Sequence, residues 1–266
     1  MTRRLRALLG ALCLLGALCL LGALGAAAAE AAPANRPRLS LIIDDLGHHP
    51  LRDQRVLNLP GPVVLAILPD SEHAEPLARA ATRAGKTVLL HLPLAPAGGP
   101  YAWRPDRPVW EWQARLEAAL ARVPQASGVN NHMGSRMTAD ARAMAWLMPE
   151  LQRRHLFFVD SRTSAATRAA AEAQRIGLAS VSRDIFLDHE RGSAAVARQY
   201  AAGLELARRH GSAVLIGHPH EATLNLLERE LPRLAGQGVD WIDIPAMIAL
   251  RGNQAMPAHG ENGLYR

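Results

Sequence analysis

The chain has 266 residues, of which 49% are hydrophobic, 20% charged and 4% aromatic, and it carries a formal net charge of +6. These proportions exclude a disordered chain or a fibrous repeat protein and indicate a globular protein with an apolar core. Lys86 is the only lysine, and the arginines are spread along the chain rather than grouped in a block. Nucleic-acid binding is therefore not expected.

The first 32 residues have the composition of a targeting segment. Arg3, Arg4 and Arg6 precede a stretch from Ala7 to Ala29 that has no charged side chain and ends in alanines. This order predicts a secretory signal peptide over residues 1–32 and export of the rest of the chain, with the periplasm as the expected location. The apolar run is also long enough to span a bilayer. An uncleaved anchor is therefore the alternative, and only then is membrane attachment expected.

The next part of the chain alternates between two patterns. Eight short apolar or β-branched runs predict strands: Leu39–Asp45, Val63–Pro69, Thr87–Pro93, Gly128–Met133, Leu156–Ser161, Ser180–Phe186, Ala213–Pro219 and Val239–Ile244. Six amphipathic patterns between them predict helices: Glu75–Ala84, Glu111–Val123, Thr138–Arg154, Ser164–Ile176, Ala194–His210 and Ala222–Leu234. Pro149 is expected to kink or divide the third of these helices.

Strands that alternate with helices predict an α/β fold with a parallel sheet. The number of runs favours a single-domain, deformed (β/α) barrel of seven to eight parallel strands over residues 33–252, and a doubly wound open sheet is the alternative. Residues 253–266 show no periodicity and are expected to form a flexible tail.

Polar side chains gather where the predicted strands end. They are Asp44, Asp45, His91, Asn130, Asn131, His132, Asp160, Asp184, Asp188, His218 and His220. Because the carboxyl ends of parallel strands share one face of a barrel, these residues should converge. Carboxylates and imidazoles without cysteine suit zinc or a similar divalent ion, since Cys13 and Cys19 both lie in the targeting segment. Such a site indicates hydrolysis of an amide or ester.

Each of these residues also has a structural interpretation. Asp44 and Asp45 could cap a helix, and His91 and His132 could be hydrogen-bonded core histidines. Asp160 could bind a backbone amide or Arg162. Asp184 and Asp188 stay open between ion pairing and substrate binding, and only one of His218 and His220 is expected to be catalytic. The chain has no G-x-S-x-G motif and no glycine-rich phosphate-binding motif, so a serine hydrolase or a nucleotide-binding protein is not expected.

Five segments together resemble the divergent polysaccharide deacetylases, which are exported relatives of the metal-dependent polysaccharide deacetylases. They are Leu41–Gly47, Leu89–Leu94, Gly128–Ser135, Phe158–Ser164 and Ile216–Pro219. The match runs from about Leu39 to Leu250, in the same order, and the block from Asn130 to Ser135 is its most specific part. The resemblance implies a deformed (β/α) barrel and metal-assisted removal of an acetyl group from an N-acetylated glycan or peptidoglycan.

The same resemblance implies individual roles. Asp44 corresponds to the catalytic base, Asp45 and His91 to metal ligands, and His218 to the general acid. The second histidine of the usual metal motif is replaced here by Ala95, so His132 is the expected third ligand. Asp160 is expected near His218, where it would orient the imidazole or bind substrate. The expected cofactor is one divalent ion, zinc in the first place.

Two other functions remain compatible with these residues. One is a non-catalytic glycan-binding or cell-envelope regulatory protein that keeps the barrel. The other is a metal-dependent hydrolase of a different amide or ester. Turnover of an acetylated glycan separates the first from a deacetylase, and acetate release from simple esters separates the second.

Overall fold

The computed structural model describes residues 36–254, so the predicted signal peptide and most of the predicted tail lie outside the described residues. The strands are β1 (Arg38–Leu46), β2 (Val64–Ile67), β3 (Val88–Leu94), β4 (Gly128–Met133), β5 (Phe157–Asp160), β6 (Ser180–Ser182), β7 (Ile185–Phe186), β8 (Ser212–Gly217) and β9 (Asp240–Trp241). The helices are α2 (Pro50–Asn58), α3 (Ala74–Arg83), α4 (Val109–Arg122), α5 (Ala141–Arg153), α6 (Ala169–Arg175), α7 (Ser193–His210), α8 (Glu221–Glu230) and α9 (Ile244–Gln254). Two short 3-10 helices, η1 (Leu231–Arg233) and η2 (Ala235–Gln237), follow α8. Within these residues no helix is both long enough and apolar enough to cross a membrane.

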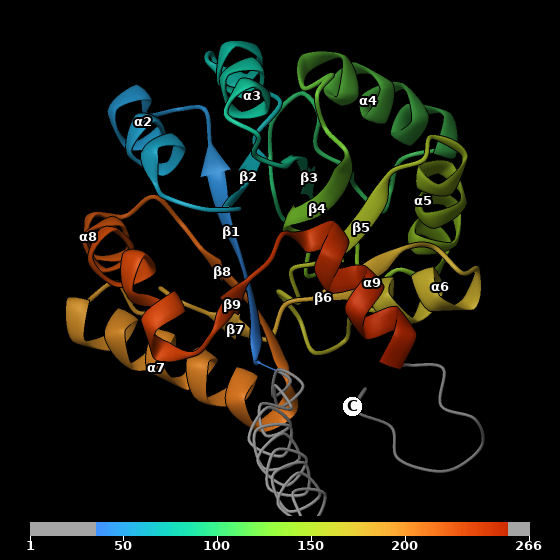
Figure 1. Ribbon diagram of the computed structural model, residues 1–266. Helices are drawn as coiled ribbons and strands as arrows, with labels where there is room; N and C mark the ends of the chain where they lie inside the picture. Colours follow the sequence, from blue (N-terminus) through green and yellow to red (C-terminus); the bar gives the residue numbers. More distant parts are fainter. Residues whose placement is uncertain (1–35, 255–266) are drawn as a thin grey trace, which may run out of the picture. The chain divides into compact units, whose positions relative to one another are not determined.

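The strands form one parallel sheet that curls on itself (Figure 1). Its order is β6-β5-β4-β3-β2-β1-β8-β7, with β9 beside β1. The two ends of this order, β6 and β7, are separated in the chain only by Arg183 and Asp184. Arg183 N donates to Asp160 O, and Asp184 N donates to Val214 O of β8, each at 2.9 Å. The chain itself therefore joins the two edges of the sheet. This is the predicted deformed (β/α) barrel in a single domain, and the open, doubly wound alternative is excluded.

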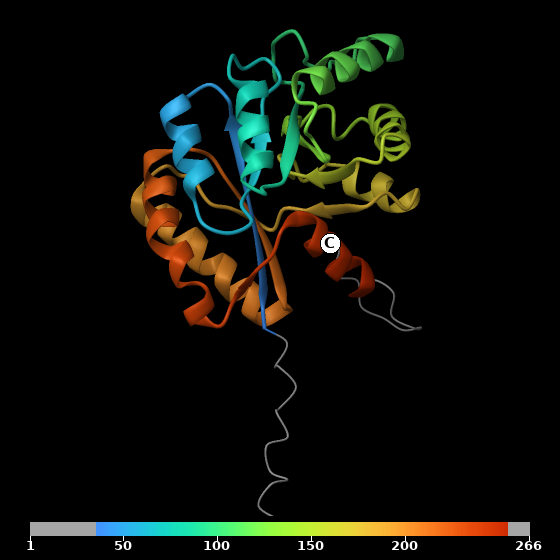
Figure 2. The same ribbon diagram turned by 45° about the horizontal axis from the view of Figure 1, so that its top comes forward.

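Two apolar layers lie on the two faces of the curled sheet. Helices cover its outer face (Figures 1 and 2). Successive strand residues point to opposite faces. In β1, Leu41 and Ile43 accordingly belong to the large cluster under the helices, whereas Ile42 belongs to the smaller inner cluster. Helix α9 contributes Ile244 and Met247 to that inner cluster.

The predicted elements are confirmed with four main differences. The eighth strand run, Val239–Ile244, is reduced to the two residues of β9, and its last residue begins α9. The sixth strand run is divided into β6 and β7, because its middle residues cross the seam of the barrel. Helix α5 is continuous across Pro149, although the sequence predicted a kink or a break there. Helices α2 and α9 were not predicted. Helix α2 is short and largely polar, and it buries only Asp53 and Val56, so it lacks a readable apolar stripe.

Candidate active site

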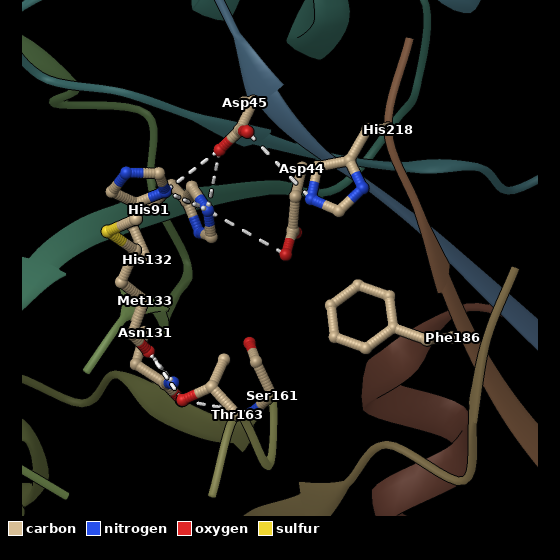
Figure 3. A pocket seen from close by; sticks show the side chains of 10 residues that line it. All are labelled: Asp44, Asp45, His91, Asn131, His132, Met133, Ser161, Thr163, Phe186 and His218. Carbon is tan, nitrogen blue, oxygen red and sulfur yellow. Dashed lines mark hydrogen bonds and ion pairs between the residues drawn. The ribbon is translucent and has the colours of Figure 1, made fainter. Parts of the chain in front are cut away.

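The polar ends of the strands meet at one mouth of the barrel. The first cavity there has a volume of about 230 Å³ and is lined by Asp44, Asp45, His91, Asn131, His132, Met133, Ser161, Thr163, Phe186 and His218 (Figure 3). These residues come from or directly follow five strands: β1, β3, β4, β5 and β8, joined by β7 through Phe186. The convergence expected from the sequence is therefore present.

Strand periodicity places most of these side chains. Asp44 has the same parity as Ile42, which faces the barrel interior, so it also points inward. Asp45 would point outward in a regular strand. Its φ of 58° turns the backbone into the left-handed region, and the pairing of β1 with β2 shifts register between Ile43 and Leu46. This local distortion lets two adjacent carboxylates reach one cavity. Residues held in such conformations concentrate at functional sites.

Three side-chain atoms converge at the centre of the cavity. Asp45 Oδ1 lies 2.9 Å from His132 Nδ1 and 3.2 Å from His91 Nε2. The two histidine nitrogens lie 3.1 Å from each other. Asp45 Oδ1 is also a buried oxygen that no geometrically satisfactory hydrogen bond occupies. This donor set, one carboxylate and two imidazoles around one point, fits a divalent ion with a further position open.

His132 reaches His91 from the neighbouring strand. Strand β4 lies beside β3, with His132 opposite Pro93 in the register. An imidazole from the neighbouring strand thus enters the same space from the side. Ala95 itself is buried, and its backbone N–H donates to Trp103 O at 2.8 Å.

An amide side chain connects the histidine cluster to the second carboxylate. Asn130 is the register partner of His91, and its Oδ1 lies 2.8 Å from His91 Nδ1. Its Nδ2 donates to Asp44 Oδ1, also at 2.8 Å. With Asp44 ionised, its carboxylate only accepts, so the amide nitrogen faces Asp44 and the amide oxygen faces His91. His91 Nδ1 then carries the proton, and the lone pair of His91 Nε2 points into the cluster.

The two carboxylates of the pair differ in their electrostatics. Burial raises the pKa of Asp44 above its usual range, and this side chain is fully enclosed. Burial also acts to raise the pKa of Asp45, but the facing His132 and His91 outweigh it and hold the pKa well below its usual range. Asp45 is thus suited to stay ionised as a ligand, and Asp44 is suited to accept a proton.

His218 stands across the cavity and is held by Asp188. Its Nδ1 lies 2.8 Å from Asp188 Oδ1, while Asp188 Oδ2 accepts from His218 N and Thr223 Oγ1 at 2.7 Å each. The ring stacks on Phe186 with 5.5 Å between centroids and 8° between planes. Burial lowers the pKa of His218, but the hydrogen bond to Asp188 outweighs it, with help from Asp44, and raises the pKa to about 9.

The sequence assigned the partner of His218 differently. Asp160 was expected to orient this histidine or bind substrate. In the structure its Oδ1 accepts from Arg162 N at 2.8 Å and its Oδ2 from Thr167 Oγ1 at 2.9 Å, and the orienting carboxylate is Asp188. Asp160 shares the parity of Phe158, which packs under the outer helices, and so it points away from the barrel interior.

A second histidine and carboxylate cluster lies next to the first. Asp188, His218 and His220 are close enough to suggest a metal site. The oxygens of Asp188, however, are already occupied by the bonds to His218 and Thr223. The rings of His218 and His220 stack, 5.6 Å apart, rather than aim at a common point. The cluster therefore serves as a support for His218, and the ion fits the cluster of Asp45, His91 and His132.

Comparisons with known proteins agree with this geometry. A model of the divergent polysaccharide deacetylase family matches residues 41–248. "Uncharacterized protein YibQ" of Escherichia coli (strain K12) is 38% identical over 205 residues, covering 76% of this chain and 64% of that protein. The chain thus spans a little under two thirds of that relative. The chain belongs to the divergent polysaccharide deacetylase family.

Solved structures share the fold. The crystal structure of uncharacterized protein ATU2773 from Agrobacterium tumefaciens C58 matches with a TM-score of 0.77 and 24% identity, over 82% of this chain and 91% of that one. A family 4 acetyl xylan esterase from Clostridium thermocellum, in complex with a cobalt ion, matches with a TM-score of 0.53 and 11% identity, over 81% of this chain and 92% of that one. At these identities the likeness concerns the fold alone.

Proposed function

We propose that this protein is a metal-dependent hydrolase that removes acetyl groups from an N-acetylated glycan in the cell envelope. The observation that carries the proposal is a single cavity that brings the cluster of Asp45, His91 and His132 together with a buried carboxylate, Asp44, and an oriented imidazole, His218. Membership of the divergent polysaccharide deacetylase family supports an acetylated glycan as the substrate. The basic start and uncharged run of residues 1–29 support a location outside the cytoplasm.

Asp45, His91 and His132 would hold the ion, and zinc is the ion that best suits one carboxylate and two imidazoles. A divalent ion bound there supplies Lewis acidity toward a carbonyl oxygen and acidifies water. Asn130 contributes before any chemistry occurs. Its bond to His91 Nδ1 fixes the tautomer that presents a lone pair to the ion.

Two residues move protons in this proposal. Asp44 accepts the proton of the attacking water, because burial favours its protonated form and Asn130 Nδ2 holds its Oδ1 in place. His218, kept protonated by Asp188, donates a proton to the departing sugar nitrogen. Met133 and Phe186 line the same cavity and offer apolar surface beside these polar groups.

The proposal is tested with protein purified without a histidine tag. Elemental analysis should find about one divalent ion per chain, and the loaded protein should release acetate from N-acetylglucosamine oligomers or from peptidoglycan. Release from simple acetate esters alone would instead indicate a hydrolase of another class. Glycan binding and a bound ion without any acetate release would contradict catalysis and favour a non-catalytic glycan-binding protein.

The two hydrogen bonds of Asn130 predict a split between variants. Asn130→Asp keeps an acceptor for His91 but loses the donor to Asp44 and adds a like charge beside it, so turnover should fall while the metal affinity is largely kept. Asn130→Ala loses both bonds, so the metal affinity should also fall, by about 10- to 100-fold, as is typical when a supporting bond to a ligand is removed. Metal titration and kcat are measured for both.

The neighbouring Asn131 provides the control. Its Oδ1 accepts a hydrogen bond from Ser161 N, and its Nδ2 donates one to Met133 O. Neither atom bonds to His91 or Asp44. If Asn130→Asp and Asn131→Ala lose metal and turnover in the same proportion, Asn130 acts only through general loosening of β4.

A further inference from the structure

A second cavity adjoins the first on the other side of His218. It has a volume of about 250 Å³ and shares Asp45, Phe186 and His218 with the first cavity. Its other lining residues are Asp188, His189, Arg191 and His220. In the proposed function, an acetyl group lies against the cluster of Asp45, His91 and His132, and His218 protonates the sugar nitrogen. The glycan beyond that nitrogen then continues into this second cavity.

The second cavity holds one positive charge, on Arg191, that has no ion-pair partner among the described residues. Both of its carboxylates already have partners. Asp188 binds His218 and Thr223, and Asp45 lies against His91 and His132. Arg191 has no carboxylate at ion-pair distance among residues 36–254, because its neighbour Glu190 faces Arg198, at 3.6 Å. Within the described residues, Arg191 therefore lies at this wall without an acid to balance it, next to His189 and His220.

His220 lies among charges of both signs. Its pKa lies below the usual range, first because of burial. Asp188 acts to raise this pKa, and the positive charges of His218, Arg191 and Arg52 act to lower it. His220 is also the N-cap residue of α8 and makes no side-chain capping bond. The positive end of that helix thus adds to the cationic character of the wall.

We infer that the second cavity is a subsite for a carboxylate carried by the glycan, with Arg191 as its main anchor and His220 beside it. The guanidinium group pairs with a carboxylate through two parallel hydrogen bonds, which gives both affinity and orientation. The inference rests on the proposed function, because it assumes that a glycan occupies the cavity. It narrows the substrate class to N-acetylated glycans that bear a lactyl ether carboxylate or a uronic acid.

Three oligosaccharides of similar length test this subsite. A neutral N-acetylglucosamine oligomer has no carboxylate, an N-acetylglucosamine–N-acetylmuramic acid oligomer carries a lactyl carboxylate, and a hyaluronan oligomer carries a uronic acid. Metal-loaded protein is compared with Arg191→Gln and with Arg198→Gln, which makes the same charge change on α7 outside the cavity. The preference for acidic over neutral glycan is measured as a ratio of kcat/KM or, if no acetate is released, as a ratio of Kd from calorimetry.

The wild type should prefer at least one acidic oligomer by about tenfold at low salt, the range of a charged hydrogen-bonded pair. That preference should disappear in Arg191→Gln, persist in Arg198→Gln and weaken as salt is added. The oligomer that shows the preference identifies the source of the carboxylate. Equal preference for all three oligomers, or an equal loss in both variants, overturns the subsite. An intact preference without acetate release supports the subsite and contradicts the hydrolase.

Discussion

Asp45→Asn is expected to lose the divalent ion, whereas Asp44→Asn is expected to keep the ion and lose turnover. Asp45 Oδ1 contacts both histidines of the cluster, so replacing an ionised ligand with a neutral amide removes charge from the binding point. The loss of metal affinity should exceed the roughly 10- to 100-fold that follows removal of a supporting hydrogen bond. Asp44 Oδ2 lies farther from the cluster, 3.7 Å from His91 Nε2.

For Asp44→Asn, kcat should fall by about 10²- to 10⁴-fold, the usual contribution of a general base. Metal content by elemental analysis and acetate release are measured on the same preparations. The corresponding substitution of Asp160 is the control, because that carboxylate binds Arg162 and Thr167 and does not line the cavity. If both variants, Asp44→Asn and Asp45→Asn, keep the metal and near wild-type turnover, the pair is structural and the proposed mechanism is wrong.

His218→Gln is expected to lower kcat by about 10²- to 10⁴-fold at neutral pH while the metal remains bound, because it removes the general acid but no ligand of the ion. The pH profile carries a second signal. A general acid works while it is protonated, so activity should fall as pH rises through the pKa of His218.

Asp188 raises the pKa of His218 to about 9, so Asp188→Asn should move this alkaline fall to lower pH. The comparison of kcat profiles between wild type and Asp188→Asn checks the shift. An alkaline limb that stays in place in Asp188→Asn would show that another group limits activity there.

Much of the fold was predictable from simple periodicity. Near-continuous apolar runs marked most of the strands because a barrel covers both faces of its sheet. The site residues Asp44, His91, His132 and His218 lie at strand ends with the parity of inward-facing neighbours. A count of alternate residues from Ile42, Leu89 or Ile216 places Asp44, His91 and His218 inside the barrel, and His132 has the opposite parity to Val129 of the outer cluster.

The same rule explains an expectation that did not hold. Counting along β5 places Phe157, Val159 and Ser161 on the inner side and Asp160 on the outer side with Phe158. Period two was thus sufficient to separate Ser161 from Asp160, and to select Asn130 two residues before His132. The residue type of Asp160 suggested catalysis, but its side of the strand did not permit it.

Other features of the site could not be predicted from a single sequence. The inward turn of Asp45 depends on its positive φ and a register shift that only the packed sheet reveals. Asp188 follows the two-residue strand β7, where no periodicity exists, and its partner His218 lies 30 positions away. Tertiary packing determines which distant residues form such a pair. The sequence therefore did not distinguish ion pairing from substrate binding for Asp188.

The most direct measurement of the central claim is anomalous diffraction from crystals of the metal-loaded protein, recorded at the absorption edge of the bound ion. The account predicts one anomalous peak per chain, in contact with Asp45 Oδ1, His91 Nε2 and His132 Nδ1, in the cavity that Asp44 and His218 also line. A peak at Asp188, His218 and His220 instead, or no peak in crystals grown with excess zinc, would contradict it.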